Sequence, residues 1–321
     1  MLYLGEQHIR ESISLDEVMD TIEKSFQVYE SGDFQMPDRM HVEREEGTIL
    51  YMPSFTKDVF GTKIISTFPE NIKKGVPTVQ ATMVLNKAST GEPIAIFDGA
   101  ALTAYRTGAV GGVGVRYTTR ENCESVGLIG TGVQGFHQLL FACTARKIKN
   151  IYIFDRSKER LISFKEKLEK RIKNVKVNIV DKVEELVLNS EIIITATPAE
   201  SPVLPDNEEM LKGKHIIAIG SYKLKMRELP KALYTLLDDV YIDTKFAAEE
   251  SGDIIVPVRE KWIKEDQIKI FGELLGAKKP INEKGGTSLY KSVGMGLFDL
   301  MVAEAIYNKA IKLQKGQKIQ D

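Results

Sequence analysis

Two positively charged side chains lie in segments whose other residues predict burial. Lys63 lies in the middle of 61–65, a run of apolar and β-branched residues, and Arg106 lies in a predicted helix among Ala, Thr and Gly. A buried cation needs an anionic partner. The partner is either a bound anion, such as a substrate or cofactor, or a carboxylate of the chain, and a long side chain can also reach water. The residue types leave these alternatives open.

A glycine-rich loop is the second feature with chemical meaning. Gly130-Thr-Gly-Val-Gln-Gly135 follows an apolar run and precedes a helical pattern at 133–145. The spacing G-x-G-x-x-G lets a pyrophosphate approach the backbone at the start of a helix. We therefore predict a dinucleotide site in a Rossmann-type fold. Its expected contacts in this loop are Gly130, Thr131, Gly132, Val133 and Gln134.

The residues after the next apolar run bear on which dinucleotide binds. Asp155 follows Gly130 by 25 residues, close to the spacing of about 20 for the acid that binds the ribose hydroxyls. An acid here repels a 2′-phosphate and so favours NAD. Arg156 and Ser157 follow directly and can grip a 2′-phosphate if Asp155 turns away, so NADP stays open as the alternative. An FAD fingerprint usually opens a chain, which disfavours FAD.

Strands alternate with helices after Asp155, which predicts a doubly wound parallel sheet. The expected strands are 175–180, 191–197, 215–221 and 239–243, and the expected helices are 157–171, with Ser157 as its cap, and 183–188. Ligands of such sheets bind at the carboxyl ends of the strands. We therefore add Ala196, Thr197, Gly220 and Ser221 to the dinucleotide site.

The first hundred residues have a different pattern. A capping box at 14–17 starts an amphipathic helix, and four strand-like runs at 48–52, 59–67, 78–85 and 94–98 predict an antiparallel or mixed sheet. A helix at 101–117 follows, and its glycines at 111, 112 and 114 indicate close packing of another element. Near the end, 285–296 leads into a long helix, where Ser292 and Gly294 either hold a polar ligand group or only cap the helix.

Composition excludes several classes of protein. The 321 residues suggest about two domains, and a net charge of −1 gives no field for nucleic acid or an anionic membrane. No apolar run is long enough to cross a bilayer. The two cysteines and four histidines have no metal-ligand spacing, so we expect no metal site, reduced thiols and a cytoplasmic protein.

Motifs spread over nearly the whole chain resemble the ornithine cyclodeaminase/mu-crystallin family of NAD(P)-dependent enzymes. They are Met52-Pro53, Gly61-Thr-Lys63, Phe68-Pro-Glu-Asn71, Gly75-Val-Pro-Thr78, Leu102-Thr-Ala-Tyr-Arg-Thr-Gly-Ala109, Gly130-Thr-Gly-Val-Gln134, Arg227-Glu-Leu229, Glu250-Ser-Gly-Asp253 and Tyr290-Lys-Ser-Val-Gly294. The resemblance implies a Rossmann NAD(P)-binding domain at 119–292. It also implies an α+β substrate-binding and dimerisation domain at 1–118 plus 293–321, and a homodimer.

The resemblance also implies roles for individual residues. Arg39, Lys63 and Arg106 bind the substrate carboxylate in this family, and the catalytic pair is Lys63, which helps proton transfer at an imine, and Arg106. The residues implied to lie against the dinucleotide are Thr78, Arg106, Gln134, Asp155 and Val293.

Two departures separate the sequence from the cyclodeaminases. Their active-site aspartate aligns with Tyr222, and their glutamate near the Met-Pro motif aligns with Leu50. Cyclisation with loss of ammonia needs such acid–base groups. We therefore expect an NAD(P)H-dependent reductase of a small imino acid, such as pyrroline- or piperideine-2-carboxylate, or the reverse oxidation of an amino acid. The alternatives are an ornithine or lysine cyclodeaminase and a dinucleotide-binding protein without turnover.

Overall fold

The computed structural model describes residues 1–277 and 286–319, and the chain forms two compact units. One unit is Met1–Arg106 with Met295–Asp321, and the other is Thr107–Gly294. Helix α3 (Gly99–Thr118) therefore begins in the first unit and ends in the second. The functional domain boundaries expected at 118 and 292 stay a prediction, and residue 285 of the expected 285–296 segment lies outside the described residues.

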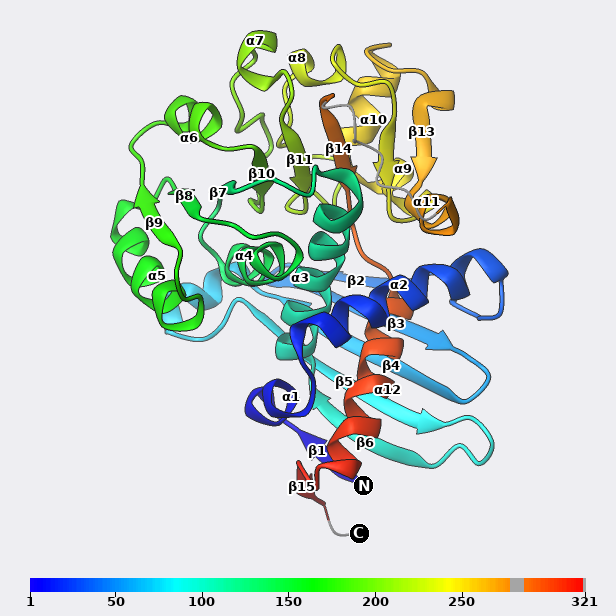
Figure 1. Ribbon diagram of the computed structural model, residues 1–321. Helices are drawn as coiled ribbons and strands as arrows, with labels where there is room; N and C mark the ends of the chain where they lie inside the picture. Colours follow the sequence, from blue (N-terminus) through cyan, green and yellow to red (C-terminus); the bar gives the residue numbers. More distant parts are fainter. Residues whose placement is uncertain (278–285, 320–321) are drawn as a thin grey trace. The chain divides into compact units, whose positions relative to one another are not determined.

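A seven-stranded sheet forms the first unit, in the order β15-β1-β6-β5-β4-β3-β2 (Figure 1). Its strands pair antiparallel except β1 with β6, so the expectation of an antiparallel or mixed sheet is confirmed. The strand bounds are Leu2–Leu4 (β1), Met40–Arg44 (β2), Gly47–Phe55 (β3), Val59–Thr67 (β4), Val79–Lys87 (β5), Pro93–Asp98 (β6) and Gln317–Lys318 (β15).

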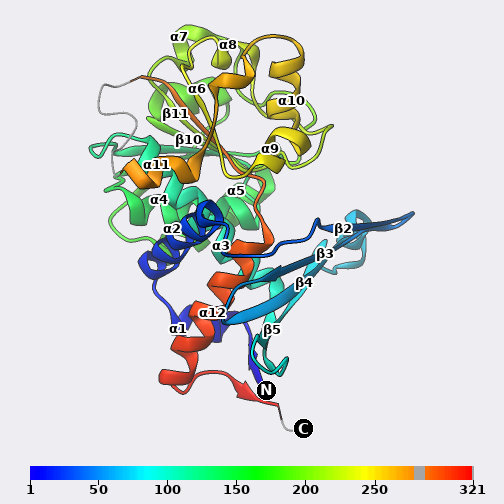
Figure 2. The same ribbon diagram turned by 90° about the vertical axis from the view of Figure 1, so that its right-hand side faces the viewer.

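Helices cover one face of this sheet. Helix α12 (Gly296–Lys312) packs on β3, β4 and β5, and α1 (Glu6–Ser12) and α2 (Leu15–Ser31) pack on α12 (Figure 2). The expected capping box of α2 is present, because the Ser14 hydroxyl accepts from the Glu17 amide at 3.3 Å. Paired side chains on neighbouring strands share a face, so the buried pair Met52 and Lys63 point the same way.

The second unit is built on eight parallel strands in the order β13-β12-β14-β11-β10-β7-β8-β9. The doubly wound sheet expected from the sequence is confirmed. Its strands are Ser125–Ile129 (β7), Asn150–Phe154 (β8), Lys176–Ile179 (β9), Ile192–Thr195 (β10), His215–Ala218 (β11), Val240–Ile242 (β12), Ile268–Ile270 (β13) and Ser288–Lys291 (β14). Strand β14 was not expected, because the segment was interpreted only as the approach to a helix.

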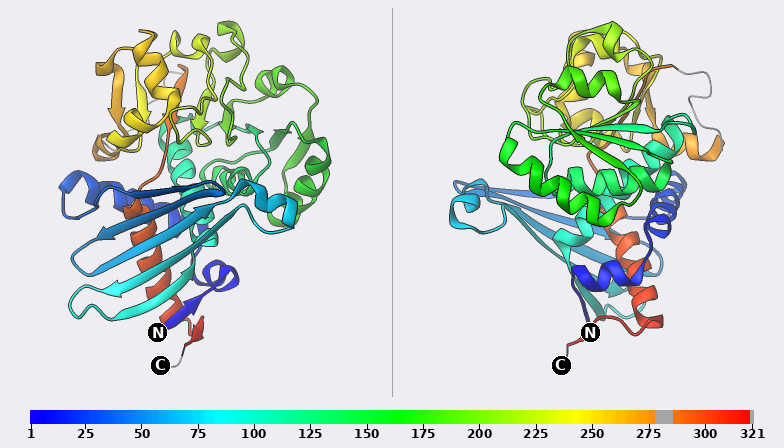
Figure 3. Two further views of the ribbon diagram at one scale, coloured as in Figure 1. Left: turned by 180° about the vertical axis from the view of Figure 1, so that it is seen from behind. Right: turned by 60° about the vertical axis from the view of Figure 1, so that its left-hand side comes forward.

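The helices of this unit alternate with the strands (Figure 3). They are Val133–Ala145 (α4), Lys158–Arg171 (α5), Val183–Asn189 (α6), Glu208–Leu211 (α7), Lys231–Tyr234 (α8), Lys245–Glu250 (α9), Gly252–Arg259 (α10) and Phe271–Ala277 (α11). Short 3-10 turns occur here at Glu265–Gln267 and in the first unit at Pro69–Lys74 (η1). Among the described residues, no helix has the length and apolar character needed to span a membrane.

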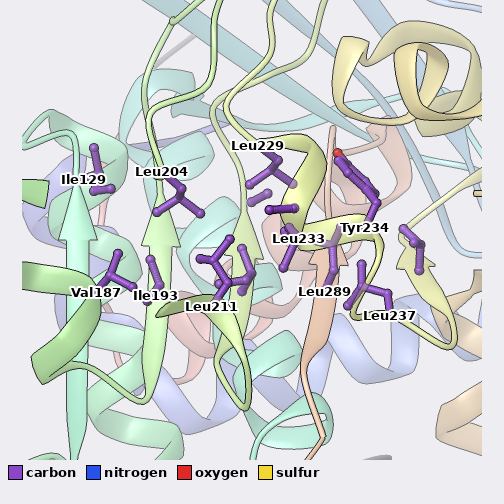
Figure 4. Close-up of a cluster of buried hydrophobic side chains, with 14 of the residues drawn as sticks. Ile129, Val187, Ile193, Leu204, Leu211, Leu229, Leu233, Tyr234, Leu237 and Leu289 are labelled. Carbon is purple, nitrogen blue, oxygen red and sulfur yellow. The ribbon is translucent and has the colours of Figure 1, made fainter. Parts of the chain in front are cut away.

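A cluster of buried aliphatic side chains fixes the strands of the second unit in place. Ile193, Leu229, Leu233 and Leu289 belong to this cluster, which Figure 4 shows in close-up. The glycines of α3 also pack closely, as the sequence indicated: a methyl group added at Gly111 would collide with Gln138 of α4, and one added at Gly114 with Tyr290 of β14.

Candidate active site and dinucleotide-binding site

Lys63 and Arg106 share one buried carboxylate in the first unit. The Nζ atom of Lys63, on β4, lies 2.8 Å from Oδ2 of Asp299, and Nε of Arg106, on α3, lies 3.0 Å from Oδ1. Lys63 and Asp299 are fully buried, and Arg106 is 6% exposed. Of the alternatives left open by the sequence, the chain's own carboxylate is therefore present for both cations.

The charges around Lys63 are unbalanced in favour of cations. Burial lowers the pKa of Lys63 to about 8; Asp299 opposes this shift, and the charges of Arg106 and Arg39 add to it. Arg39 is partly buried and directly precedes β2. Lys63, Arg106 and Asp299 together carry a formal charge of +1. A small carboxylic acid is the kind of ligand that such a surplus attracts.

Asp299 is the member of this group that the sequence reasoning missed. It is the fourth residue of α12 and lies inside an otherwise apolar stretch of this helix whose residues are buried. Aspartate is almost never fully buried unless it is paired. A lone carboxylate within an apolar helical stretch was therefore the signal that could have found it.

The glycine loop of the second unit connects β7 to α4. Gly130 has a φ of 101°, and a side chain there would meet the backbone of Ala196, while one at Gly135 would meet the carbonyl oxygen of Gly130. A side chain at Gly132 would meet nothing within 4 Å. The first and third glycines are thus required by packing, whereas the second leaves space for a ligand.

The start of α4 is suited to an anion. Gly132 is its N-cap and gives no side-chain cap, and the first turn, which contains Val133 and Gln134, carries no acidic residue. Backbone amides and the helix dipole favour a phosphate at such a helix end. The loop therefore fits the pyrophosphate of NAD or NADP.

Asp155 lies at the carboxyl end of β8 and is held by its neighbours. Its Oδ2 accepts hydrogen bonds from the amide of Thr131 at 2.7 Å and from the hydroxyl of Thr131 at 2.8 Å, and its Oδ1 accepts from the Ser157 amide at 2.9 Å. Burial alone would raise the pKa of Asp155, but these hydrogen bonds outweigh it and the pKa is lowered. The carboxylate is therefore charged near neutral pH.

The residues that follow Asp155 differ in part from expectation. Arg156 is exposed. Ser157 is the N-cap of α5, as expected, but its side chain makes no capping hydrogen bond. Its backbone amide donates to Asp155.

The remaining candidate residues of this unit follow the ends of neighbouring strands. Ala196 and Thr197 follow β10, Gly220 and Ser221 follow β11, and Val293 follows β14. The structure thus brings these turns, the glycine loop and Asp155 to the same end of one sheet, where ligands of such sheets bind. The amides of Thr197, Gly220, Ser221 and Val293 donate to buried carboxylates, which are described below.

Other candidates have more ordinary surroundings. Thr78 belongs to the first unit, between η1 and β5, and its carbonyl accepts a hydrogen bond from Phe68 at 2.8 Å. Ser292 and Gly294 donate to Asp243, and the N-cap of α12 is Met295, so neither caps the helix.

The two positions where cyclodeaminases carry carboxylates lack acidic groups. Leu50 pairs with Ile65 in the first sheet. Tyr222 follows β11, and burial raises its pKa, so it is neutral at physiological pH. Within the described residues, no group of three or more His, Cys, Asp or Glu side chains is placed to hold a metal ion.

Comparison with known proteins places these two sites in a family. Residues 2–314 match the model of the ornithine cyclodeaminase/mu-crystallin family. The chain belongs to this family. The resemblance stated from the motifs is therefore confirmed, and it covers both units.

Three similar proteins cover the chain from end to end. The Δ1-pyrroline-2-carboxylate reductase of Bacillus cereus is 31% identical over 329 residues, with 100% of both chains covered. The structure of the Thermococcus litoralis Δ1-pyrroline-2-carboxylate reductase with NADH and L-proline is 34% identical, has a TM-score of 0.92 and covers 99% of this chain and 100% of its own. An archaeal alanine dehydrogenase dimer with bound NAD is 30% identical, with a TM-score of 0.89 and coverage of 100% and 99%.

Proposed function

We propose that this protein is an NAD(P)H-dependent reductase that reduces the C=N bond of a small cyclic imino acid, with Δ1-pyrroline-2-carboxylate as the substrate. The observation that carries the proposal is the buried group of Lys63, Arg106 and Asp299, in which a lysine with a lowered pKa lies beside a guanidinium. Two relatives at 31% and 34% identity bear the name of this reductase, and one of them holds L-proline.

Each residue of the group has a task in such a reaction. Arg106 donates its Nε–H to Asp299 and has four further N–H groups, which suit a carboxylate. Arg39 adds a second positive charge. Lys63 donates a proton to the ring nitrogen, so that the C=N bond gains one hydrogen at carbon and one at nitrogen. A pKa of about 8 lets Lys63 release and regain a proton near neutral pH.

The glycine loop and Asp155 provide for the cofactor. Bound NAD(P)H supplies the hydride for the carbon of the C=N bond. Gly132 and the start of α4 would hold the pyrophosphate, and Asp155 would accept hydrogen bonds from the ribose hydroxyls. Because Asp155 is charged and would repel a 2′-phosphate, we propose NADH as the preferred form.

We further propose that the protein is a homodimer. One face of the first sheet is turned away from α12 (Figure 3, left). By the strand register, apolar residues of adjacent strands share this face. We call this face the outer face; its apolar residues are Met40, Val42, Ile49, Tyr51, Phe55, Phe60, Ile64, Val84 and Ile96. Met40 is 61% and Ile64 41% exposed. Large exposed apolar side chains gathered on one face mark an interaction surface, and the archaeal alanine dehydrogenase relative is a dimer.

A second candidate function follows from that relative. An amino-acid dehydrogenase uses the same parts in the opposite direction, with alanine as the substrate by analogy with the archaeal protein. A cyclodeaminase is less well supported, because Leu50 and Tyr222 provide no carboxylate. The cytoplasmic location expected from the sequence stays a prediction.

A steady-state assay tests the proposal. In the first two arms, purified protein is incubated with NADH or NADPH and either pyrroline-2-carboxylate or pyruvate plus ammonium. In the third arm it is incubated with ornithine and catalytic NAD. We expect oxidation of NADH and formation of L-proline in the first arm. Faster turnover of pyruvate plus ammonium would favour the dehydrogenase, and ammonia with proline from ornithine without net NADH would favour the cyclodeaminase. Binding of NADH without turnover in any arm would indicate a binding protein.

A further inference from the structure

Four ionisable side chains are completely buried near the carboxyl ends of β11, β12 and β14 in the second unit. They are Glu228, Asp243, Asp253 and Lys291, which we call the carboxylate cluster. Nζ of Lys291 lies 3.9 Å from Oδ2 of Asp253 and donates to the carbonyl oxygen of Ala218 at 3.3 Å. Burying three carboxylates beside one lysine is costly, which calls for a function.

Glu228 ties together the turns that follow β10 and β11. Its Oε1 accepts from the amide and the hydroxyl of Thr197 at 2.7 and 2.8 Å. Its Oε2 accepts from the amides of Gly220 and Ser221 at 2.8 and 3.2 Å. Four donors surround the two oxygens, so a proton on either oxygen would displace one of them. The geometry therefore requires the charged form of Glu228.

Asp253 holds Glu228 in place in turn. Its Oδ1 accepts from the amides of Glu228 and Leu229 at 2.8 and 3.0 Å. Its Oδ2 is the atom that faces Lys291. Asp253 thus links the ammonium of Lys291 to the backbone that carries Glu228.

Asp243 accepts hydrogen bonds from the turn that follows β14, as Glu228 does from the turns that follow β10 and β11. Its Oδ2 accepts from the Ser292 hydroxyl at 2.6 Å and from the amides of Val293 and Gly294 at 3.0 and 2.7 Å. These residues directly follow Lys291 at the end of β14. Every strand-end turn assigned to the dinucleotide beyond β8 is therefore fixed by the cluster.

Lys291 is the positive charge that balances the cluster. Burial raises the pKa of Glu228 and of Asp243, and Lys291 acts against the rise in both. Burial lowers the pKa of Lys291, and Asp253, Glu228 and Asp243 oppose that shift in this order. Lys291 thus favours the charged forms of Glu228 and Asp243, and the three carboxylates favour the charged form of Lys291.

We propose that Lys291 is a positioning residue for the dinucleotide: its buried ammonium, beside Asp253, supports Glu228 and Asp243, whose carboxylates hold the strand-end turns in the shape that the cofactor binds. The inference rests on the proposed function, in which NADH is the ligand of these turns. Lys291 itself acts only through Glu228, Asp253 and Asp243. Without its charge, a carboxylate takes up a proton, and a turn amide loses its acceptor.

The test is the affinity of the full-length protein for NADH, measured by fluorescence titration from pH 6 to 9. Lys291→Met should weaken binding about tenfold or more at pH 7, comparable to the loss of one hydrogen bond to a charged group. Binding should recover as the pH rises and the carboxylates ionise again. The double variant Asp253→Asn/Lys291→Met should bind better than Lys291→Met, because it also removes the charge of Asp253, which raises the pKa of Glu228.

A matched control lies at the opposite end of β11. Lys214 is a partly buried lysine that donates to the Ser190 carbonyl oxygen at 2.7 Å. Lys214→Met should leave both the affinity for NADH and its pH dependence unchanged. Wild-type affinity with a wild-type pH dependence in Lys291→Met would overturn the inference. Failure of the wild-type protein to bind NADH would instead contradict the proposed function.

Two further measurements apply if Lys291→Met does not fold. Glu228→Gln places an amide N–H against the donors of the turns, so it should weaken NADH binding at all pH values without recovery. In the wild-type protein without NADH, the amides of Thr197, Gly220 and Ser221 should be protected from hydrogen exchange. Wild-type affinity in Glu228→Gln, or rapid exchange of these amides, would overturn the inference.

Discussion

Lys63 and Asp299 form a fully buried ion pair, with Nζ of the lysine 2.8 Å from Oδ2 of the aspartate. The two residues are 236 positions apart in the chain. The other oxygen of Asp299 accepts from Arg106. One carboxylate on α12 therefore sets the spacing between the two cations that we propose to act on the substrate, and its charge opposes the fall in the pKa of Lys63 caused by burial.

Replacing Asp299 should move the pH profile of the reaction. The proton-donating form of Lys63 is the protonated one, so kcat/KM for imine reduction should fall as the pH rises through about 8. In Asp299→Asn the pKa of Lys63 is lower, so the fall should begin at a lower pH. Once this pKa lies below 7, kcat/KM at pH 7 should drop about tenfold for each further pH unit of displacement. Steady-state assays between pH 5.5 and 9 measure this.

Asp181→Asn is the control for Asp299→Asn. Asp181 also pairs with a lysine, at 2.6 Å from Lys158, but both side chains are exposed. Its replacement should leave the profile as in the wild-type protein. An alkaline limb that does not move in Asp299→Asn would mean that Lys63 does not donate the proton.

Lys63→Met should separate catalysis from cofactor binding. Loss of a general acid lowers turnover by about 10² to 10⁴, whereas the glycine loop and Asp155 belong to the other unit and are unchanged. We expect a large fall in kcat with a change in NADH affinity of less than about threefold. Equal losses in both would show that Lys63 is structural.

The sequence was sufficient to predict most elements of the fold. Strand β4 and helix α4 begin and end where the apolar patterns do, because each has a clear period and a turn or glycine at its limits. Strands β1, β2, β13, β14 and β15 were missed. Each has five residues or fewer, and so short a segment shows no clear period of its own; its pairing with another strand determines it.

The candidate site could be predicted only where it rests on local spacing. The glycine loop is contiguous, so its backbone geometry follows from the sequence. Asp299 contacts Lys63 only after α12 has packed on β4, and nothing near either residue indicates the other. The role of Glu228 could not be predicted for the same reason: its two oxygens accept hydrogen bonds from turns that follow two separate strands.

His215 should make the protein less stable in mild acid. It is fully buried on β11 with Nδ1 2.9 Å from the Ser288 hydroxyl oxygen, and burial, with the charges of Arg120 and Arg146, lowers its pKa to about 4. The unfolded chain binds the proton near pH 6.5. Stability from this residue is therefore complete above pH 6.5 and falls by about 3 kcal/mol as the pH drops to 4.

Urea unfolding of the wild-type protein and of His215→Gln between pH 4 and 7 measures this contribution. The free energy of unfolding should decrease less steeply with falling pH in the variant, even if the variant is less stable at pH 7. Parallel curves for the two proteins would contradict the assignment.

Asp155→Ser should relax the choice between NADH and NADPH. A fixed negative charge near the 2′ position opposes a phosphate by about 1 to 4 kcal/mol at 4 Å, depending on solvent exposure, so the ratio of the two Kd values should change about tenfold. Thr131→Val is the control, because it removes only the hydroxyl that donates to Asp155 and keeps the charge. Thr131→Val should weaken both cofactors alike; a wild-type ratio in Asp155→Ser would exclude Asp155 as the discriminating residue.

Ile64→Glu should convert the proposed dimer into monomers. Ile64 lies on the outer face beside Tyr51 and Thr82 of the neighbouring strands and is 41% exposed. A charge there cannot be buried against a second copy without a large desolvation cost. Light scattering after size-exclusion chromatography measures the mass. Ile162→Glu is the matched control, because Ile162 is 65% exposed on α5 of the other unit. A halved mass in Ile64→Glu alone supports the outer face as the interface, whereas a dimer that survives it requires a different one.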